Sequence, residues 1–257
     1  LACGALIAAK VPLWLVLLPV QGVLMVFLFT LEHECTHKTP FRAPALSDWV
    51  GRLCGMVLLL PFEWFRYFHL AHHRHTNIPG LDPELASEKP ETVTQWVWHV
   101  SGLPYWAAGV RLMAALVMGR TEEEYLPQSA RSRIVREARV MALIYLALAL
   151  TLIWSPMLLW VWIVPVLVGQ PALRLYLLAE HGDCPRVTDM FENTRTTFTN
   201  RIVRFVAWNM PYHAEHHVFP AVPFHKLPAL HLKMRDHLKV TADGYAAFTR
   251  DYLDRRM

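Results

Sequence analysis

The chain has 257 residues, of which 54% are hydrophobic and 18% are charged, and its formal net charge at pH 7 is +4. A soluble domain of this length would show amphipathic periodicity, whereas this chain contains long, nearly uncharged apolar runs. Its four cysteines form no C-x-x-C pair, which excludes a built-in rubredoxin-like or iron–sulfur centre and a disulfide framework. The composition therefore indicates an integral membrane protein.

Three apolar runs are long enough to cross a bilayer, which takes ~20 residues. They cover residues 13–31, about 134–154 and about 157–179, and the last run carries a single charge, Arg174. Residues 1–9 are also apolar but too short to span, and they lack the basic start and the cleavage site of a signal peptide. Because the sequence begins at Leu1 rather than Met, we expect the end of a truncated transmembrane helix here, in a hairpin with the next one.

Lys and Arg gather at residues 38–74, at residues 131–139 where the second run begins, and at residues 186–204 after the last run. The positive-inside rule places these segments in the cytoplasm.

Residues 49–60 and 96–118 are apolar, but the first stretch is short and the second is interrupted by Gly, Pro and Arg. We therefore expect both to be helices lying in the membrane interface.

The expected architecture is an all-α membrane protein with about four transmembrane helices, the first truncated, under a helical cytoplasmic cap. We expect one domain over residues 1–257. Its parts are a transmembrane hairpin (1–31), a cytoplasmic and interfacial segment (32–133), a second transmembrane hairpin (134–180) and a cytoplasmic segment (181–257) that includes a surface helix at about 227–238.

Histidines form short clusters beside these runs. Nine of the fourteen histidines fall in four windows: His33-Glu-Cys-Thr-His37, His69-Leu-Ala-His72-His73, His181, and His213-Ala-Glu-His216-His217. Imidazoles three and four positions apart project from one face of a helix. Nine nitrogens exceed the needs of one metal but suit two metals with four or five ligands each, and nitrogen ligands favour iron, copper or zinc over magnesium or calcium.

Two other metal sites compete for the first window. His33-Glu34-x-x-His37 is also the H-E-x-x-H pattern of zinc proteases, including intramembrane ones, with Asp82 as the candidate third ligand. A carboxylate-bridged di-iron bundle needs two Glu-x-x-His pairs, and only Glu34-x-x-His37 is present. The acidic residues Glu34, Glu180 and Glu215 adjoin histidines and are candidates for orienting the imidazoles.

The spacing H-x-x-x-H, H-x-x-H-H and H-x-x-H-H, in HECTHKTPFRAP, FHLAHHRHT and WNMPYHAEHHVFP, resembles the membrane fatty acid desaturase superfamily, and its bacterial branch in particular. The resemblance implies a non-haem di-iron centre with these ligands: His33, His37, His69, His72, His73, His181, His213, His216 and His217. Acyl-CoA desaturases place an asparagine four residues before the ligand that His181 matches. Leu177 stands there in this chain, and Asn209 is a candidate substitute.

The implied function is an O₂-dependent desaturase that introduces a double bond into a fatty acyl or similar lipid-like chain. Hydrogen abstraction from an unactivated methylene needs a metal-based oxidant, which side chains cannot supply. The implied cofactors are two Fe ions, replaced by Zn in some preparations, with O₂ as co-substrate.

Electrons would come from ferredoxin or rubredoxin with a reductase. Arg186, Arg195, Arg201 and Arg204 form a candidate docking patch, although the positive-inside rule alone accounts for arginines at these positions and is the favoured explanation. We expect a bacterial inner-membrane enzyme with its active site on the cytoplasmic side and no nucleic-acid partner. Hydroxylases and ketolases of the same superfamily remain the alternative. A metal transporter is disfavoured because the spans are almost empty of polar groups.

Overall fold

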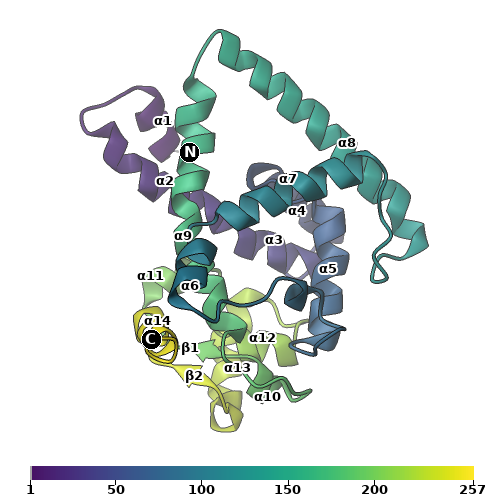
Figure 1. The fold of residues 1–257 in the computed structure, drawn as a ribbon, viewed down its shortest axis with the longest axis vertical. Coiled ribbons are helices and arrows are strands. Elements are labelled where there is room, and N and C mark those ends of the chain that lie inside the picture. The colour runs from purple at the N-terminus through teal and green to yellow at the C-terminus, as the bar shows by residue number, and fades with distance from the viewer. Residues whose placement is uncertain (1) are drawn as a thin grey trace.

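The computed structural model describes residues 2–257 and is almost entirely helical (Figure 1). The α-helices are α1 (Ala2–Ala8), α2 (Leu17–Val26), α3 (Leu28–Thr36), α4 (Pro44–Leu58), α5 (Phe62–His75), α6 (Val93–Val100), α7 (Leu103–Val117), α8 (Gln128–Leu150), α9 (Val164–His181), α10 (Met190–Asn193), α11 (Arg201–Val206), α12 (His213–Val218), α13 (Leu227–Met234) and α14 (Tyr245–Asp254). Short 3₁₀ turns cover Trp14–Val16, Pro83–Ala86, Thr151–Ile153, Phe224–Lys226 and Arg235–His237, and a π-helical turn covers Leu159–Ile163. The strands β1 (Thr196–Thr197) and β2 (Thr241–Ala242) pair in parallel, with Thr196 opposite Thr241.

Within residues 2–257, two helical stretches are long and apolar enough to cross a membrane by themselves, Trp14–Thr36 and Leu159–His181. They pack closely through α2 and α9. A Cβ atom on Gly22 would lie 2.2 Å from the carbonyl oxygen of Pro165, and one on Gly169 would lie 2.3 Å from the carbonyl carbon of Gly22. Small residues at such a contact let helix backbones approach, which is a main source of attraction between helices in lipid. These stretches agree with two of the three predicted spans.

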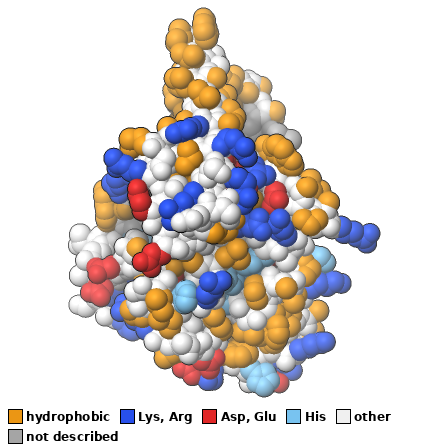
Figure 2. All heavy atoms as spheres, turned by 90° about the vertical axis from the view of Figure 1, so that its right-hand side faces the viewer, with side chains coloured by type: hydrophobic (Ala, Val, Ile, Leu, Met, Phe, Trp, Pro, Cys, Tyr) orange, Lys and Arg blue, Asp and Glu red, His pale blue; other side chains and the backbone are white. Residues whose placement is uncertain are grey.

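The third predicted span, at about 134–154, lies in the 23-residue helix α8 and the turn after it. Arg133, Arg136, Glu137 and Arg139 crowd its first half, so α8 is not among the helices apolar enough to cross a membrane on their own. That half packs on α7, whereas the second half exposes apolar side chains such as Leu143 (67%) and Leu146 (59%). In Figure 1, α8 rises away from the bundle and turns at the top into α9; Figure 2 shows apolar side chains over that tip and Lys and Arg below it.

The two segments predicted to lie in the interface are bent helix pairs. Helices α4 and α5 meet at 100°, and α6 and α7 at 56°. The first bend has Leu59 in the left-handed region (φ 59°) followed by Leu60 and Pro61, and the second has Gly102 (φ 74°). If each bent pair crosses the membrane as one broken span, the protein has up to four spans. The bends direct α5 downward, beside the end of α3 (Figure 1).

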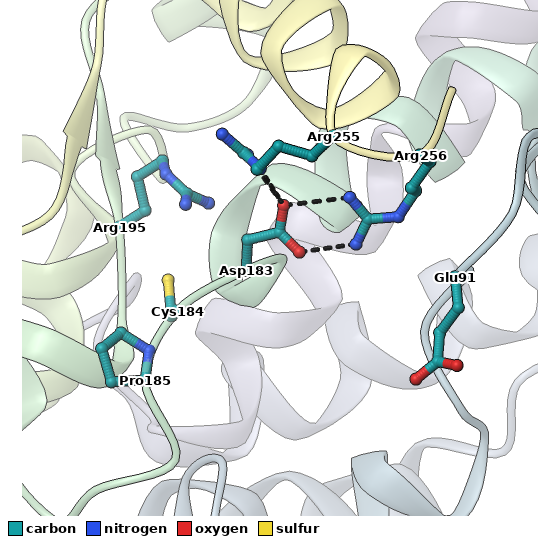
Figure 3. Close-up of a pocket in the computed structure, with 7 residues that line it drawn as sticks. All are labelled: Glu91, Asp183, Cys184, Pro185, Arg195, Arg255 and Arg256. Atoms are coloured by element: carbon teal, nitrogen blue, oxygen red, sulfur yellow. Dashed lines mark hydrogen bonds and ion pairs between the residues drawn. The ribbon is translucent and has the colours of Figure 1, made fainter.

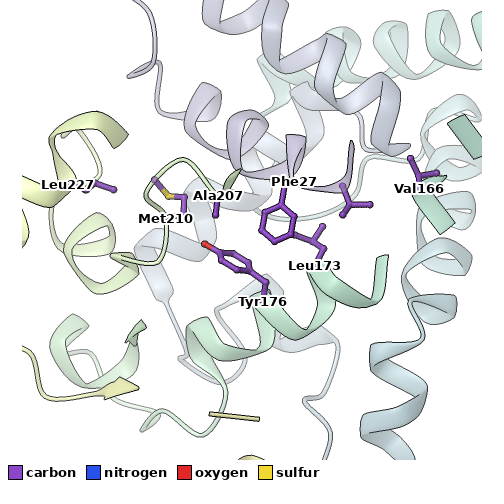
Figure 4. Close-up of a cluster of buried hydrophobic side chains, with 8 residues drawn as sticks. Phe27, Val166, Leu173, Tyr176, Ala207, Met210 and Leu227 are labelled. Atoms are coloured by element: carbon purple, nitrogen blue, oxygen red, sulfur yellow. The ribbon is translucent and has the colours of Figure 1, made fainter. Parts of the chain in front are cut away.

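The carboxy-terminal part of the chain forms a cap on the lower ends of α3, α5 and α9 (Figure 1). One buried apolar cluster joins the cap to the spans. Phe27 and Tyr176 meet edge-on, with ring centroids 5.1 Å apart, and Met210 and Leu227 of the cap belong to the same cluster (Figure 4). The predicted surface helix at 227–238 is α13 with a 3₁₀ turn, and it buries Leu227 and Met234. Of the predicted truncated helix, Leu1 lies outside the described residues, and Ala2–Ala8 is helical.

Candidate metal centre

The nine clustered histidines come together at the junction of spans and cap. The end of α3 carries His33 and His37, α5 carries three more, α9 ends at His181, and α12 carries the last three. Eight of the nine are buried and His37 is half-buried. Helical spacing explains the convergence, because each cluster presents its imidazoles from one face of its helix. The structure thus brings side chains from all four sequence windows to one place.

The imidazoles divide into two adjoining groups. The first group is His33, His37, His69, His73 and His216, whose ligand atoms all lie within 4.8 Å of one another. The second contains His72, His181 and His217 by the same measure. His213 joins the second group, because its Nε2 lies 3.1 Å from Nε2 of His181 and 3.1 Å from Nε2 of His217.

The spacing of these nitrogens suits metal ligation. Nitrogens bound at about 2.1 Å to one ion, at right angles, lie roughly 3 Å apart. The Nε2 atoms of His37 and His69 are 2.9 Å apart, and those of His72 and His181 are 3.2 Å apart. Imidazole–imidazole hydrogen bonds would give similar distances. However, both ring nitrogens of His33, His73 and His216 are buried without a hydrogen-bond partner among the described residues. Buried polar atoms are rarely left unpaired, and a bound ion would account for one nitrogen of each ring.

The protonation state of the α12 histidines also suits ligation. Burial lowers the pKa of His216 and His217 well below the usual value, and the neighbouring imidazoles lower it further. Both side chains are therefore neutral near pH 7, which is the form that binds a metal.

Hydrogen bonds hold the outer nitrogens of the second group. Nδ1 of His72 lies 3.0 Å from the carboxylate of Asp82, and Nδ1 of His181 donates to the carbonyl of Asn193 (3.1 Å). Nδ1 of His217 lies 3.1 Å from the hydroxyl of Thr76, which donates to the carbonyl of His72. A proton held on Nδ1 leaves Nε2 free for a metal. Asn193 lies twelve residues beyond His181 and has no signal near a cluster, and Thr76 follows His73 by three residues but has nothing in the sequence that links it to His217.

Of the residues proposed to orient the imidazoles, two have a carboxylate that faces a clustered histidine and two bond other residues. The carboxylate of Glu180 lies 3.4 Å from Nδ1 of His213, and that of Glu34 lies 3.7 Å from Nδ1 of His216. Glu215 instead bonds His231 and the hydroxyl of Thr196. Asn209 donates its amide to the carbonyl of Phe224 (3.2 Å).

The residues around His33-Glu34-x-x-His37 differ from those expected at the zinc site of a protease. His33 and His37 share their group with three further imidazoles, and Asp82 contacts His72 of the other group. One oxygen of Glu34 accepts hydrogen bonds from the hydroxyl of Thr39 (2.6 Å) and the backbone amide of Phe224 (3.2 Å). The other oxygen of Glu34 has no hydrogen-bond partner among the described residues. The additional imidazoles would have no task in a protease.

Several known proteins are similar to this chain. The first, sn-1 oleoyl-lipid 12-desaturase of Picosynechococcus sp., is 31% identical over 118 residues, which are 42% of this chain and 33% of that protein. The sphingolipid delta(4)-desaturase/C4-monooxygenase DES2 of Mus musculus is 26% identical over 205 residues, covering 76% of this chain and 58% of that protein. The sn-1 acyl-lipid omega-3 desaturase (ferredoxin) of Synechocystis sp. is 28% identical over 80 residues, or 31% and 22% of the two chains.

This chain thus spans from about a fifth to three-fifths of the length of these three relatives. The family model described as "Fatty acid desaturase" matches residues 12–249, from the first span through the cap, and this stretch includes all nine clustered histidines. The match covers most of the sequence, and with it the chain belongs to the fatty acid desaturase family.

Proposed function

We propose that the protein is an O₂-dependent desaturase that introduces a double bond into a fatty acyl or similar lipid chain, with two irons held by the nine histidines. The observation that carries this proposal is the pair of adjoining histidine groups, five and four imidazoles, in a chain of the desaturase family. His33, His37, His69, His73 and His216 would hold one iron. His72, His181, His213 and His217 would hold the other. Two irons bound there supply the oxidizing power needed to remove hydrogen from a methylene with O₂.

The protein's own residues prepare the site. Burial of the imidazoles keeps water away from the chemistry and keeps His216 and His217 neutral. Asp82, Asn193 and Thr76 fix the ring orientation of three ligands. The apolar spans beside the site give a lipid chain a route from the bilayer that never enters water.

Electrons would arrive from an external donor, and the name of the Synechocystis relative includes ferredoxin. The predicted docking patch needs one change: Arg195 is only 6% exposed and donates to the carbonyl of Ala179, so it cannot lie on an open surface. It lines a pocket of about 690 Å³ with Arg255 and Arg256 (Figure 3). The pocket lies next to a metal-site histidine, because the backbone amide of Cys184 donates to the carbonyl of His181 (3.3 Å). Asp183 pairs with Arg255 and Arg256 in this pocket, which leaves three arginines against Asp183 and Glu91. We place the docking site of an acidic donor here, beside the exposed Arg186 that follows Pro185.

We also place the cap on the cytoplasmic side of a bacterial inner membrane. The arginines of the lower half of α8 and of the cap support this orientation by the positive-inside rule. Reporter fusions after Pro90 and Pro185 should both give cytoplasmic signals. A signal from the opposite side at Pro90 would separate His69, His72 and His73 from the other ligands and contradict the shared site.

The test of the function is turnover by the purified protein in lipid nanodiscs, loaded with iron and supplied with ferredoxin, reductase and O₂. We expect donor-dependent loss of two hydrogens from a lipid chain, read by mass spectrometry. Oxidation of the donor by a two-iron protein without any change in lipid would contradict the proposal.

Hydroxylation is the second candidate, and one observation favours it: the mouse relative is named both desaturase and C4-monooxygenase. The same experiment separates the two reactions, because a hydroxylase adds oxygen to the chain and leaves no double bond.

A further inference from the structure

Helix α11 of the cap carries two large apolar side chains that point away from the protein. Ile202 is 74% exposed and Phe205 is 85% exposed, and a spacing of three residues puts them on one face of the helix. The helix is fixed at both ends. At its start, the side chain of Asn200 accepts a hydrogen bond from the amide of Ile202 (3.0 Å). At its end, the amide of Asn209 donates to the carbonyl of Arg204 (2.7 Å). The fold therefore holds an apolar patch outward on a short, ordered helix.

The other side of α11 is seated against the two membrane-crossing stretches. Ala207, the residue that ends α11, belongs to the buried cluster that also contains Phe27 and Tyr176 (Figure 4). Phe27 lies in the stretch Trp14–Thr36, and Tyr176 lies in the stretch Leu159–His181. In Figure 1, α11 lies beside the lower part of α9. The patch on α11 is thus continuous with the lipid-facing surface of the spans.

The level of this contact lies within the thickness of a bilayer. Trp14 and Trp160, near the starts of the two stretches, meet edge-on with ring centroids 5.2 Å apart, and tryptophans are typical of the membrane interface. At 1.5 Å per residue, Phe27 lies roughly 20 Å beyond Trp14 along its stretch. By the same measure, Tyr176 lies roughly 24 Å beyond Trp160. The hydrocarbon core of a bilayer is about 30 Å thick, so side chains that α11 exposes at this level face acyl chains.

The charged residues of α11 suit the headgroups of these lipids. Arg201 and Arg204 lie three residues apart on the helix, and no Asp or Glu occurs in the sequence between Glu192 and Glu215. Arg201 is exposed, and Nε of Arg204 has no hydrogen-bond partner within the described part of the chain. A guanidinium forms paired hydrogen bonds with phosphate oxygens. Two arginines beside an apolar patch therefore fit a lipid, whose phosphate adjoins its acyl chains.

Two other occupants of this surface fit less well. A second copy of the chain, packed symmetrically on α11, would bring Arg201 and Arg204 of both copies together, because a two-fold contact pairs the same patch with itself. A soluble acidic protein would have to enter the lipid region to cover Phe205. The bilayer is the occupant that meets both the charge and the level of the patch.

We propose that α11 inserts Ile202 and Phe205 into the acyl region of the leaflet on the cap side. Arg201 and Arg204 then lie at the level of the lipid phosphates. Nη1 of Arg204 donates to the hydroxyl of Tyr212 (2.6 Å), and Tyr212 directly precedes α12. The inserted helix thereby anchors the cap and holds the histidines of α12 at a set height relative to the bilayer. This anchoring does not depend on which reaction the metal centre performs.

Photochemical cross-linking tests the insertion. In the full chain in nanodiscs of phosphatidylcholine and phosphatidylglycerol, p-benzoylphenylalanine, a photoreactive analogue of phenylalanine, replaces Phe205 or, as the matched control, Leu232. Leu232 is also apolar and is 67% exposed, but it lies on α13, below α12 and farther from the spans (Figure 1). After irradiation, mass spectrometry locates the lipid carbon that has bonded to the protein. We expect adducts on acyl methylenes, at a yield roughly tenfold higher from position 205 than from position 232, because only the first position lies at the depth of the acyl chains.

A second pair of variants tests the arginine contact. Arg201→Gln removes one attraction to the anionic leaflet and should lower the yield of acyl adducts from position 205 roughly twofold. Lys233→Gln, at an exposed position of α13, should leave that yield unchanged. Equal lipid yields from positions 205 and 232 would overturn the proposal, and so would adducts from position 205 that join two copies of the chain. An unchanged yield in Arg201→Gln would contradict the phosphate contact. Because no turnover is measured, failure of the desaturase proposal would leave these results unaffected.

Discussion

The two histidine groups of the metal centre are held in different ways. In the second group, Asp82, Asn193 and Thr76 hydrogen-bond the outer nitrogens of His72, His181 and His217. In the first group, the outer nitrogens of His33, His73 and His216 have no such partner within residues 2–257. Their rings are held by packing instead: His33 and His69 have centroids 4.1 Å apart, and His73 stacks on His217 at the same distance. The difference teaches that hydrogen bonds orient three of the four imidazoles in the second group, whereas three of the five in the first group have no hydrogen bond to orient them.

The largest expected effect comes from removing one ligand of either group. His72→Ala and His216→Ala should each reduce turnover by more than about 100-fold, beyond the 10- to 100-fold typical of residues that only orient ligands. Membrane insertion should survive, because it depends on the apolar spans. The measurement is donor-dependent product formation normalized to inserted protein.

His225→Ala is the matched control for these variants. His225 is exposed, so its loss should change turnover by less than about twofold. His231 would be a poor control because it bonds the buried Glu215, next to His216. Equal loss from all three alanine variants would mean that the histidines support folding rather than chemistry.

The next effect in size sharpens the contrast between the groups. Asp82→Asn removes the carboxylate that holds His72 and should weaken iron binding by the second group about 10- to 100-fold. Glu34→Gln, near the first group, should cost less than tenfold, because Glu34 lies 3.7 Å from His216 without a hydrogen bond to it. Competition with a chelator measures both affinities. A larger loss from Glu34→Gln than from Asp82→Asn would reverse the proposed contrast.

The smallest effect concerns the hydrogen bonds of one hydroxyl group, that of Thr76. Thr76→Val keeps the shape of the side chain but removes the hydroxyl that bonds Nδ1 of His217. The loss of about 1 kcal/mol should speed the release of iron from the second group a fewfold. Release is followed by stopped-flow mixing with a coloured chelator. If the release rate does not change, the hydroxyl does not fix the ring of His217.

The sequence was sufficient to predict the nine converging histidines and two of the spans, because both follow from short-range periodicity. It could not predict the outer partners of the second group. Asp82 lies ten residues beyond His72 and Asn193 lies twelve beyond His181, in segments placed only by tertiary packing. Adjacency in sequence was also misleading for Glu215. A residue two positions after His213 projects from the opposite side of the helix, which is why Glu215 bonds His231 and Thr196.

Local sequence was also insufficient to define the membrane spans. A hydropathy run marks α8 as a span, but the arginines that were interpreted as flanking charges lie inside the helix itself. Arg174 was visible as the one charge in its run. Its position over the ring of Tyr105 could not be predicted, because that contact joins residues far apart in the sequence.

The central claim is a centre of two irons, one in each histidine group, and the iron content of anaerobically purified protein tests it most directly. Elemental analysis should find two irons per chain in the wild type. It should find one in the double variant His72→Ala/His181→Ala and one in His33→Ala/His69→Ala. A wild-type protein with a single metal that is retained after the loss of His72 and His181 would contradict the account.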